Sequence, residues 1–333
     1  MADTPPENFP IVIGVPAGTR ARGIILSVSL AIWMAVSSMG AARAAGISIP
    51  NASFESPATT FVAINIDEWQ KGPKPDWFDE TGGFRWNQLT GIFKNTPSTS
   101  QDHLDNCDGE QAIWIFAIPE VELFQDYNSV DWDDAVPAHG FDARFEAGKA
   151  YALTVGVNGG GGGMVVGATL RMSLYFRDGA SNKVLVGMTF ITNTAANFPT
   201  HTHLTDYQVR VPVVRPGDPC AGQNIGIQIL STVTTNSQGG YWDLDNVRLC
   251  AVREPALTAP RRSGGQFQFA LESEPGLTFE ILASGSVELP LSEWTSLGML
   301  TNDTGTVTYV DTPLPVNRRF YRARQVSAAV NCP

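Results

Sequence analysis

Strict alternation of apolar and polar positions runs through the middle of the chain. The apolar sets are Tyr151, Leu153, Val155 and Val157; Leu170, Met172, Leu174 and Phe176; Tyr207, Val209, Val211 and Val213; and Ile225, Ile227 and Ile229. Because successive side chains of a strand point to opposite faces, a period of two predicts strands with one buried face. No segment shows sustained helical periodicity, so the sequence predicts an all-β protein built as a β-sandwich.

A second, smaller sandwich is predicted after residue 252. Residues 253–265 carry Pro255, Pro260 and the run Arg261-Arg262-Ser263-Gly264-Gly265, a composition typical of linkers. Alternation resumes at Phe267 and Phe269 and continues to Tyr321. We therefore expect a first domain at 45–252, a linker at 253–265, a small antiparallel sandwich at 266–326 and an unstructured tail at 327–333.

The glycine run 159–163 lies between two predicted strands. It lacks the Gly-Lys-Ser/Thr ending of a phosphate-binding loop. Because glycine tolerates positive φ, the run is predicted to be a flexible connection.

The first 44 residues have the form of an export signal. Arg20 and Arg22 precede an apolar run from Gly23 to Met39, and Ala42-Arg43-Ala44 has the small-x-small pattern of a signal-peptidase site. Cleavage before Ala45 predicts a protein that is secreted, periplasmic or at the cell surface, with no stable membrane insertion. The alternative is an uncleaved anchor, because the apolar run approaches the length of a membrane span.

The excess of acidic residues argues against some classes of binding partner. The chain has 22 basic and 33 acidic residues, and without residues 1–44 it keeps 19 basic and 31 acidic residues, a net charge of about −12. A field of this sign repels phosphates, which argues against nucleic acid and anionic membranes as partners. Acidity is compatible with cation binding.

Two carboxylates stand out in the stretch Tyr241–Leu249. In a regular strand, Asp243 and Asp245 would share the parity of Val247 and Leu249 and point toward the apolar side. An unpaired inward carboxylate costs several kcal/mol, so a cation, an arginine or a local bulge must intervene. We expect calcium.

The cysteines are compatible with oxidation in an exported chain. Cys220 precedes a predicted strand and Cys250 ends another, so a Cys220–Cys250 disulfide between neighbouring strand ends is predicted. The states of Cys107 and Cys332 stay open: a bond between domains, free thiols or, for Cys332, a bond to another chain.

Aromatic residues gather in the polar segment 67–89. Trp69, Trp77 and Trp86 lie there among lysines, prolines and aspartates. A tryptophan face beside polar groups is suited to sugar binding, and the alternative is that the rings pack under a long loop.

Several short motifs, in their order along the chain, resemble the galactose-binding-like jelly rolls of secreted carbohydrate-binding modules. They are Pro50-Asn51-Ala52-Ser53-Phe54-Glu55, Asn106-Cys107-Asp108-Gly109, Phe145–Tyr151 and Asp243–Val247, and they cover roughly residues 46–252. The resemblance implies a jelly roll with a structural calcium ion between its first and last strands. The implied ligands are the side chains of Glu55 and Asp245, with further oxygens from Asn51 and from Asp108 and Gly109. The alternative is that Asp245 pairs with Arg248 or Arg210.

The same jelly roll is used by the Stig cyclases of indole alkaloid biosynthesis, which contain calcium and use an aspartate as general acid. The resemblance, at the level of the domain and its terminal motifs, implies Asp243 as the acid, with Trp69, Trp77 or Tyr207 as pocket walls. The C-terminal region, with Trp294–Gly298 and Arg319–Arg324, resembles fibronectin-type modules that act as spacers.

Three functions follow from these observations. The leading one is an exported, calcium-stabilised module that binds a glycan or another surface ligand, with Trp69, Trp77, Trp86 and Tyr207 as ligand-binding residues. The alternative is a calcium-dependent jelly-roll enzyme that uses Asp243, either cyclase-like or carbohydrate-active. The third is a structural surface-interaction protein.

Overall fold

The computed structural model describes residues 45–130, 139–312 and 318–326. The predicted leader at 1–44 and the predicted tail at 327–333 lie outside these residues. The chain contacts divide the described residues into two units, one spanning Ala45–Val252 and the other beginning at Arg253. No described helix is long and apolar enough to span a membrane.

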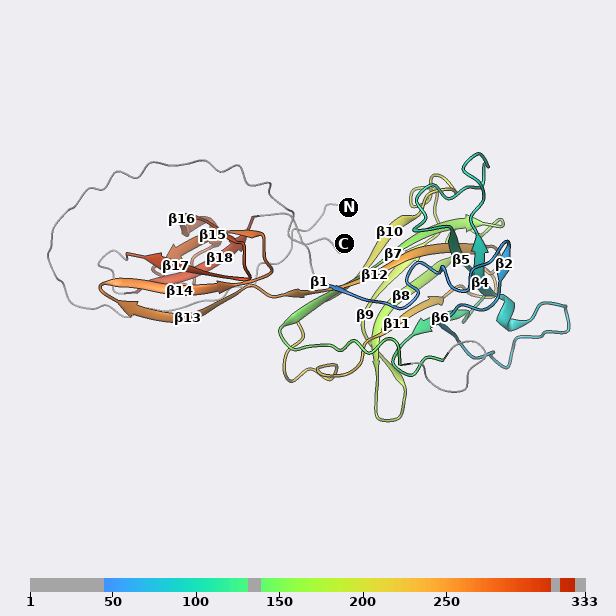
Figure 1. Ribbon diagram of the computed structural model, residues 1–333, viewed down its shortest axis with the longest axis horizontal. Helices are drawn as coiled ribbons and strands as arrows, with labels where there is room; N and C mark the ends of the chain where they lie inside the picture. Colours follow the sequence, from blue (N-terminus) through green and yellow to red (C-terminus); the bar gives the residue numbers. More distant parts are fainter. Residues whose placement is uncertain (1–44, 131–138, 313–317, 327–333) are drawn as a thin grey trace. The chain divides into compact units, whose positions relative to one another are not determined.

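The first unit is a two-layered β-sandwich (Figure 1). One layer is a seven-stranded sheet in the order β10-β7-β12-β5-β4-β2, with β1 also paired to β12. Its strands are β1 (Ala45–Ile47), β2 (Val62–Ala63), β4 (Thr90–Lys94), β5 (Gln111–Phe116), β7 (Lys149–Gly161), β10 (Thr205–Val211) and β12 (Tyr241–Arg253). The other layer is a five-stranded sheet in the order β3-β6-β11-β8-β9, formed by β3 (Gln70–Lys71), β6 (Glu122–Gln125), β8 (Thr169–Arg177), β9 (Lys183–Thr192) and β11 (Gly226–Ser231). All pairings of these strands that are described are antiparallel, which confirms the all-β prediction.

The predicted alternation places the core between the two sheets. Leu153, Val155 and Val157 of β7 are fully buried in one cluster with Leu170, Met172 and Leu174 of β8 and Ile227 and Ile229 of β11. Each sheet therefore has an inner apolar face and an outer face whose side chains have the opposite parity. The candidate site lies on the outer face of the seven-stranded sheet.

The second unit consists of two three-stranded sheets. Their orders are β13-β14-β17 and β16-β15-β18, with bounds β13 (Ala256–Ser263), β14 (Gln266–Glu272), β15 (Leu277–Ser284), β16 (Thr295–Asn302), β17 (Thr306–Asp311) and β18 (Phe320–Gln325). The sheets share a core, in which Phe267 of β14 stacks on Tyr321 of β18. This is the predicted smaller sandwich.

The segment predicted as a linker is instead largely a strand. β13 pairs with β14 from Ala256 to Ser263, with a bulge between Thr258 and Arg261. β13 is the edge of its sheet, where proline and arginine are tolerated because one side of the strand needs no hydrogen-bond partner. The composition of 253–265 therefore indicated an edge strand and not a linker.

Candidate functional site

The carboxyl group of Asp243 lies on the outer face of the seven-stranded sheet. Asp243 is 9% exposed, and its Oδ2 accepts a long hydrogen bond of 3.4 Å from Nδ2 of Asn158 on β7. Among the described residues, no other hydrogen bond to the Asp243 side chain is found. Burial raises the pKa of Asp243 to about 7, and the Asn158 bond partly opposes that rise. A carboxyl group in this position can hold or release a proton near neutral pH.

A change of parity in β12 puts the carboxylates on this outer face. Trp242 and Leu244 are in the core, and so are Val247 and Leu249, so the core-facing set changes from even to odd numbers near Asn246. Asn246 has φ 57°, a left-handed backbone conformation that asparagine tolerates better than most residues. The prediction that both carboxylates face the apolar interior is therefore wrong, and of the three remedies considered, the local bulge is present.

Aromatic rings flank Asp243 along the sheet. Trp114 of β5 pairs directly with Asp243 in the strand register, and its Nε1 donates to the Gln88 carbonyl at 3.2 Å. Gly91 of β4 gives this ring room, because a Cβ there would lie 2.4 Å from Trp114 Cη2. Two residues along the same pair of strands, Tyr241 of β12 makes an edge contact with Phe116 of β5 at 6.1 Å between ring centroids.

The glycine run forms part of this wall and is not a flexible connection. β7 extends through Gly161, and a Cβ on Gly161 would lie 2.4 Å from Tyr241 Cε2. The glycines predicted to form a flexible connection therefore include the end of a strand, where the absence of a side chain lets the Tyr241 ring pack.

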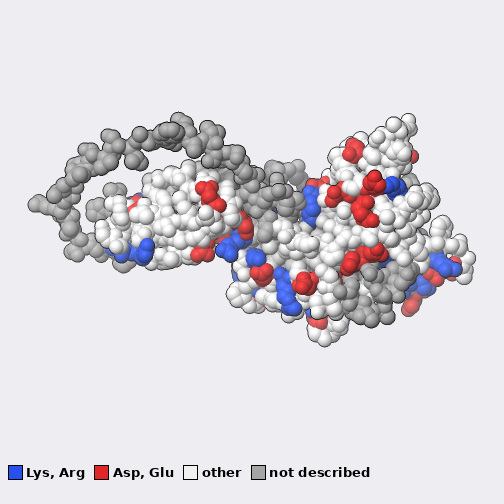
Figure 2. Space-filling model, in the orientation of Figure 1, with Lys and Arg blue, Asp and Glu red and all other residues white. Residues whose placement is uncertain are grey.

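Two loops cover the outer face of the seven-stranded sheet next to Asp243, over Asp245 and Asn158. The 95–110 loop connects β4 to β5, and the 193–204 loop connects β9 to β10. Leu104 and Leu204, one from each loop, pack with Ala112 of β5 in a small cluster separate from the main core. On the visible face, acidic side chains gather around the loops beside β10 and β5 (Figure 2).

Asp245 lies deeper under the same cover. It is fully buried, and its Oδ2 accepts a hydrogen bond of 2.6 Å from the backbone N–H of Asp108. Its Oδ1 is buried with no hydrogen-bond partner, and burial raises the pKa of Asp245 to about 7. Burial raises the pKa of the Cys107 thiol, and the nearby Asp245 carboxylate raises it further.

The predicted calcium ligands are only partly brought together. Oε1 of Glu55 accepts from the backbone N–H groups of Glu110 and Gln111, both at 2.8 Å, which places Glu55 against Gly109 and close to Asp108. The Asn51 side chain is engaged elsewhere: its Oδ1 accepts from Ser56 N, and its Nδ2 donates to the carbonyls of Ser56 and Asp67. Within the described ranges, no three His, Cys, Asp or Glu side chains are grouped so that they could hold a metal ion. The alternative arginine partners are also engaged, since Arg248 pairs with Asp206 and Arg210 bonds to Gln208.

The predicted aromatic ligand residues lie apart from Asp243. Trp69 and Trp86 line a cleft of about 660 Å³ together with Lys71, Lys74, Glu80 and Arg85, but both rings are buried and donate to backbone carbonyls. Trp77 is 45% exposed, donates to Glu120 and does not line that cleft. Tyr207 packs against the core, on the opposite side of the sheet from Asp243.

Lys71 forms a fixed part of the cleft. Its ammonium donates to the carbonyls of Ile64 and Asn87 at 2.5 Å and of Thr90 at 2.6 Å, while burial lowers its pKa to about 7. The lysine thus ties the backbone at Ile64 to the 87–90 segment, in the lining that it shares with the two tryptophans.

The predicted Cys220–Cys250 disulfide is wrong. Cys220 and Cys107 have free thiols, whereas Cys250 is disulfide-bonded, so its partner is not among the described residues. Cys220 lies buried in the core cluster, while Cys250 is directed away from that cluster, with Sγ near the Ala152 carbonyl. The positions of Cys220 and Cys250 near strand ends did not indicate on which side of the sheet each side chain lies.

Three residues beside Asp243 were not identified from the sequence: Trp114, Tyr241 and Asn158. Trp114 and Asn158 do have outward parity in their strands, which is a readable signal. What the sequence lacks is the register that places β5 and β7 on either side of β12.

A family model matches most of the first sandwich. The family model described as HpiC1 cyclase matches residues 45–250. Among solved structures, the chain is similar to the Stig cyclase Fisc from Fischerella sp. TAU in complex with (3Z)-3-(1-methyl-2-pyrrolidinylidene)-3H-indole, at 20% identity over 63% of this chain and 98% of that one, with a TM-score of 0.45. A cyclase from the same organism in complex with 4-(1H-indol-3-yl)butan-2-one shares 21% identity over 64% and 100% of the two chains, with a TM-score of 0.45.

More distant similarity extends to carbohydrate-binding modules. The CBM22-1–GH10 modules of Clostridium thermocellum endo-1,4-β-D-xylanase 10B, complexed with xylohexaose, share 12% identity over 60% of this chain and 27% of that one, with a TM-score of 0.29. No curated protein matches the chain. Because the family model spans more than half of the residues, the chain belongs to the HpiC1 cyclase family.

Proposed function

We propose that this protein is an acid catalyst of the cyclase type, and that Asp243 donates a proton to a small molecule bound on the outer face of the seven-stranded sheet. The observation that carries the proposal is a buried carboxyl group with one long hydrogen bond and no cationic partner in the described chain. Its raised pKa supports the role, because a general acid is most effective when its pKa lies near the working pH.

The step we propose begins with protonated Asp243. The proton passes from the carboxyl group to a basic atom of the substrate, and the carboxylate that remains keeps the Nδ2–H of Asn158 as a donor. When the product forms, the carboxylate takes a proton back, so the enzyme returns to its first state. Oδ1 of Asn158 is buried without a partner and can accept a hydrogen bond from a substrate N–H or O–H. The Trp114 ring supplies an apolar wall beside the acid.

We propose a structural calcium ion near Asp245 as part of this function. The buried, unpartnered Oδ1 of Asp245 is a hard oxygen donor of the kind calcium accepts. Glu55, whose Oε1 lies beside Gly109 and accepts from two backbone N–H groups, could add its other carboxylate oxygen. Backbone carbonyls, and not the Asn51 side chain, would have to complete the shell. The ion would neutralise the acids beside β5, and no chemical step is assigned to it.

The test of acid catalysis compares wild type with Asp243→Asn. Purified protein is incubated with the substrate of the Fischerella Stig cyclase, and products are separated by chromatography. We expect turnover to fall by about 10²-fold or more in Asp243→Asn, while binding of 4-(1H-indol-3-yl)butan-2-one, followed by tryptophan fluorescence, persists. Asp142→Asn, an exposed acid with the same change, is the control. Full turnover by Asp243→Asn would refute the acid role.

The test of the cation is a thermal melt in calcium, in excess chelator and in calcium restored. A reversible fall in Tm that is absent from Asp245→Asn would support an ion at this carboxylate. Equal melts of the wild type in all three conditions would count against it.

A glycan-binding module is the second candidate, favoured by the cleft between Trp69 and Trp86. The exposed cations Lys74 and Arg85 at this cleft suit an acidic sugar better than a neutral one in a chain of net charge −11. On this proposal the protein is exported through its leader and the second sandwich is a spacer. Isothermal titration with oligogalacturonate and with xylohexaose, on wild type and on Arg85→Gln, tests it; the absence of heat with either sugar would exclude these ligands.

A further inference from the structure

The two loops over Asp243 are joined by a compact set of polar contacts. Asn106 makes a reciprocal pair with Leu204: its Nδ2 donates to the Leu204 carbonyl and its Oδ1 accepts from the Leu204 N–H, both at 2.8 Å. Next to it, the Asp105 N–H donates to the Thr202 carbonyl at 3.0 Å. The exposed side chains of His203 and Asp105 add a hydrogen bond of 2.6 Å between Nδ1 and Oδ1.

These contacts lie over Asp245 and Asn158, the neighbours of the candidate acid. Leu204 lies over β7, because a Cβ on Gly156 would be 3.2 Å from both Leu204 Cβ and the Asp245 carbonyl. The His201 carbonyl accepts from Nδ2 of Asn158 at 2.9 Å, and this Nδ2 is also the donor to Asp243. The 193–204 loop therefore rests on the residues beside Asp243, and the 95–110 loop is fastened to it through Asn106.

Such a cover leaves little room for a ligand at Asp243. The acid is almost fully buried, and the cleft lined by Trp69 and Trp86 does not reach it. The loops have no strand in either range. The 95–110 loop and the end of the 193–204 loop rest on a small apolar cluster centred on Leu104, Ala112 and Leu204, whereas Phe198 holds the earlier part of the second loop in the main core. Segments with few buried contacts open locally at a lower free energy than the core strands.

We propose that the 95–110 loop and the 201–204 end of the second loop form a lid that closes the way to Asp243, and that Asn106 is the latch that holds the lid closed. A small molecule reaches the acid after the Asn106–Leu204 pair separates. Asn106 is suited to this role because one amide satisfies both the N–H and the carbonyl of Leu204, so its loss leaves two backbone groups unpaired at once. Only the purpose of the lid rests on the proposed function. The loops can open whether or not Asp243 is an acid catalyst.

The chain contains its own reporter of opening. Cys107 is a free thiol in the 95–110 loop and packs against the cluster under the lid, whereas Cys220 is a free thiol buried in the main core. Alkylation of Cys107 measures opening of the lid, and alkylation of Cys220 in the same molecules measures opening of the sandwich. Both rates are obtained by iodoacetamide labelling of the full chain at one pH, followed by peptide mass spectrometry.

We expect Asn106→Ala to raise the labelling rate of Cys107 by about tenfold or more and to leave that of Cys220 unchanged. His203→Gln, which removes an exposed pair and does not threaten folding, should raise the Cys107 rate by a smaller factor, about two- to fivefold. Asn224→Ala is the control, because Asn224 also donates its amide to a carbonyl between two loop segments, but away from Asp243.

Two results would overturn the lid. One is an unchanged Cys107 rate in both Asn106→Ala and His203→Gln; the other is an equal rise at Cys107 and Cys220, which would mean that the whole sandwich opens. The lid and the acid role fail separately, because labelling needs no substrate. If labelling responds as expected and Asp243→Asn keeps full turnover, the lid stands and the acid role does not.

Discussion

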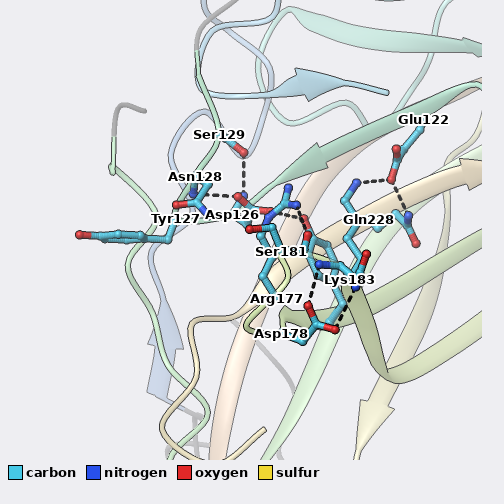
Figure 3. A network of polar contacts seen from close by, with 12 residues as sticks. Glu122, Asp126, Tyr127, Asn128, Ser129, Arg177, Asp178, Ser181, Lys183 and Gln228 are labelled. Atoms are coloured by element: carbon cyan, nitrogen blue, oxygen red, sulfur yellow. Dashed lines mark hydrogen bonds and ion pairs between the residues drawn. The ribbon is translucent and has the colours of Figure 1, made fainter. Parts of the chain in front are cut away.

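The two outer faces of the first sandwich both bury charged side chains, but they treat them in opposite ways. On the five-stranded sheet, Asp126 accepts from the Tyr175 hydroxyl at 2.5 Å and from Arg177 Nε at 2.8 Å, and Glu122 bonds to both Lys183 and Gln228 (Figure 3). On the seven-stranded sheet, Asp243 has one long bond from an amide, and Asp245 has an oxygen without a partner.

The outer face of the five-stranded sheet therefore carries a structural network, whereas the carboxyl groups on the seven-stranded sheet are able to bind a proton or a ligand. The Lys183 ammonium also lies 3.3 Å from the centroid of the Phe124 ring, so Lys183 has both an anion and a ring as partners. Asp243 and Asp245 lack such balance, which costs stability and leaves them able to bind a proton, a cation or a substrate.

The largest expected effect comes from breaking the balanced face. Asp126→Ala leaves Arg177 without its carboxylate and the Tyr175 hydroxyl without its acceptor, so the free energy of unfolding should fall by about 3–5 kcal/mol. Urea unfolding followed by far-UV circular dichroism measures it. Glu110→Gln, at an exposed ion pair with Lys94, is the control and should change little. A loss below about 1 kcal/mol in Asp126→Ala would contradict the contrast between the faces.

The opposite sign is expected on the other face. The folded-state pKa of Asp243 is raised from 3.8 to about 7, so between these values the folded state binds more protons than the unfolded state, and stability falls as pH rises from about 4 to 7. At pH 8 the ionised group costs up to roughly 4 kcal/mol, since one pKa unit corresponds to about 1.4 kcal/mol. Asp243→Asn should therefore be more stable than wild type at pH 8 and equal to it near pH 4.

Unfolding is measured in chelator, so that a bound cation does not offset the carboxylates. Asp178→Asn, at an exposed turn on the β8–β9 hairpin, serves as the comparison at both pH values. A destabilised Asp243→Asn at pH 8 would show that the carboxylate has a compensating partner, and the two faces would then not differ.

The contrast also shows how far the sequence could lead. Alternation predicted the sandwich, because parity within one strand is a local property: the sets around Val155, Leu170 and Ile227 are all in the core. The pair Asp243 and Asp245 was recognised as anomalous for the same reason. Its face was assigned wrongly because one residue, Asn246, adopts a left-handed conformation and shifts the parity of everything before it.

Contacts between distant strands could not be predicted. Trp114 and Asn158 meet Asp243 because β12 lies between β5 and β7, an order that follows from the topology and not from any one segment. Trp69 and Trp86 do lie in one region, as expected, but their rings are mostly buried. Composition alone does not distinguish buried aromatic rings from exposed ones.

A smaller effect tests how the site is shaped. Gly161→Ala places a Cβ 2.4 Å from the Tyr241 ring, so either the ring or the end of β7 must shift, at a cost of about 1–3 kcal/mol in the free energy of unfolding. Gly179→Ala, with nothing within 4 Å and no positive φ, is the matched control and should stay within about 0.5 kcal/mol. Equal stability of the two variants would mean that the glycine run does not define this wall.

The smallest effect concerns the cation nearest to the carboxylates in sequence. Arg248 follows Asp245 by three residues but pairs with Asp206, whose side chain is 56% exposed, so Arg248→Gln should lower the free energy of unfolding by less than about 1 kcal/mol. The variant should also keep the wild-type fall in stability between pH 4 and 7 in chelator, because Arg248 does not balance Asp243 or Asp245. Urea unfolding at pH 4, 6 and 8 decides this. A steeper pH dependence in Arg248→Gln would reveal that the guanidinium partly compensates the buried acids, and the outer face of the seven-stranded sheet would then be a weaker version of the balanced network opposite it.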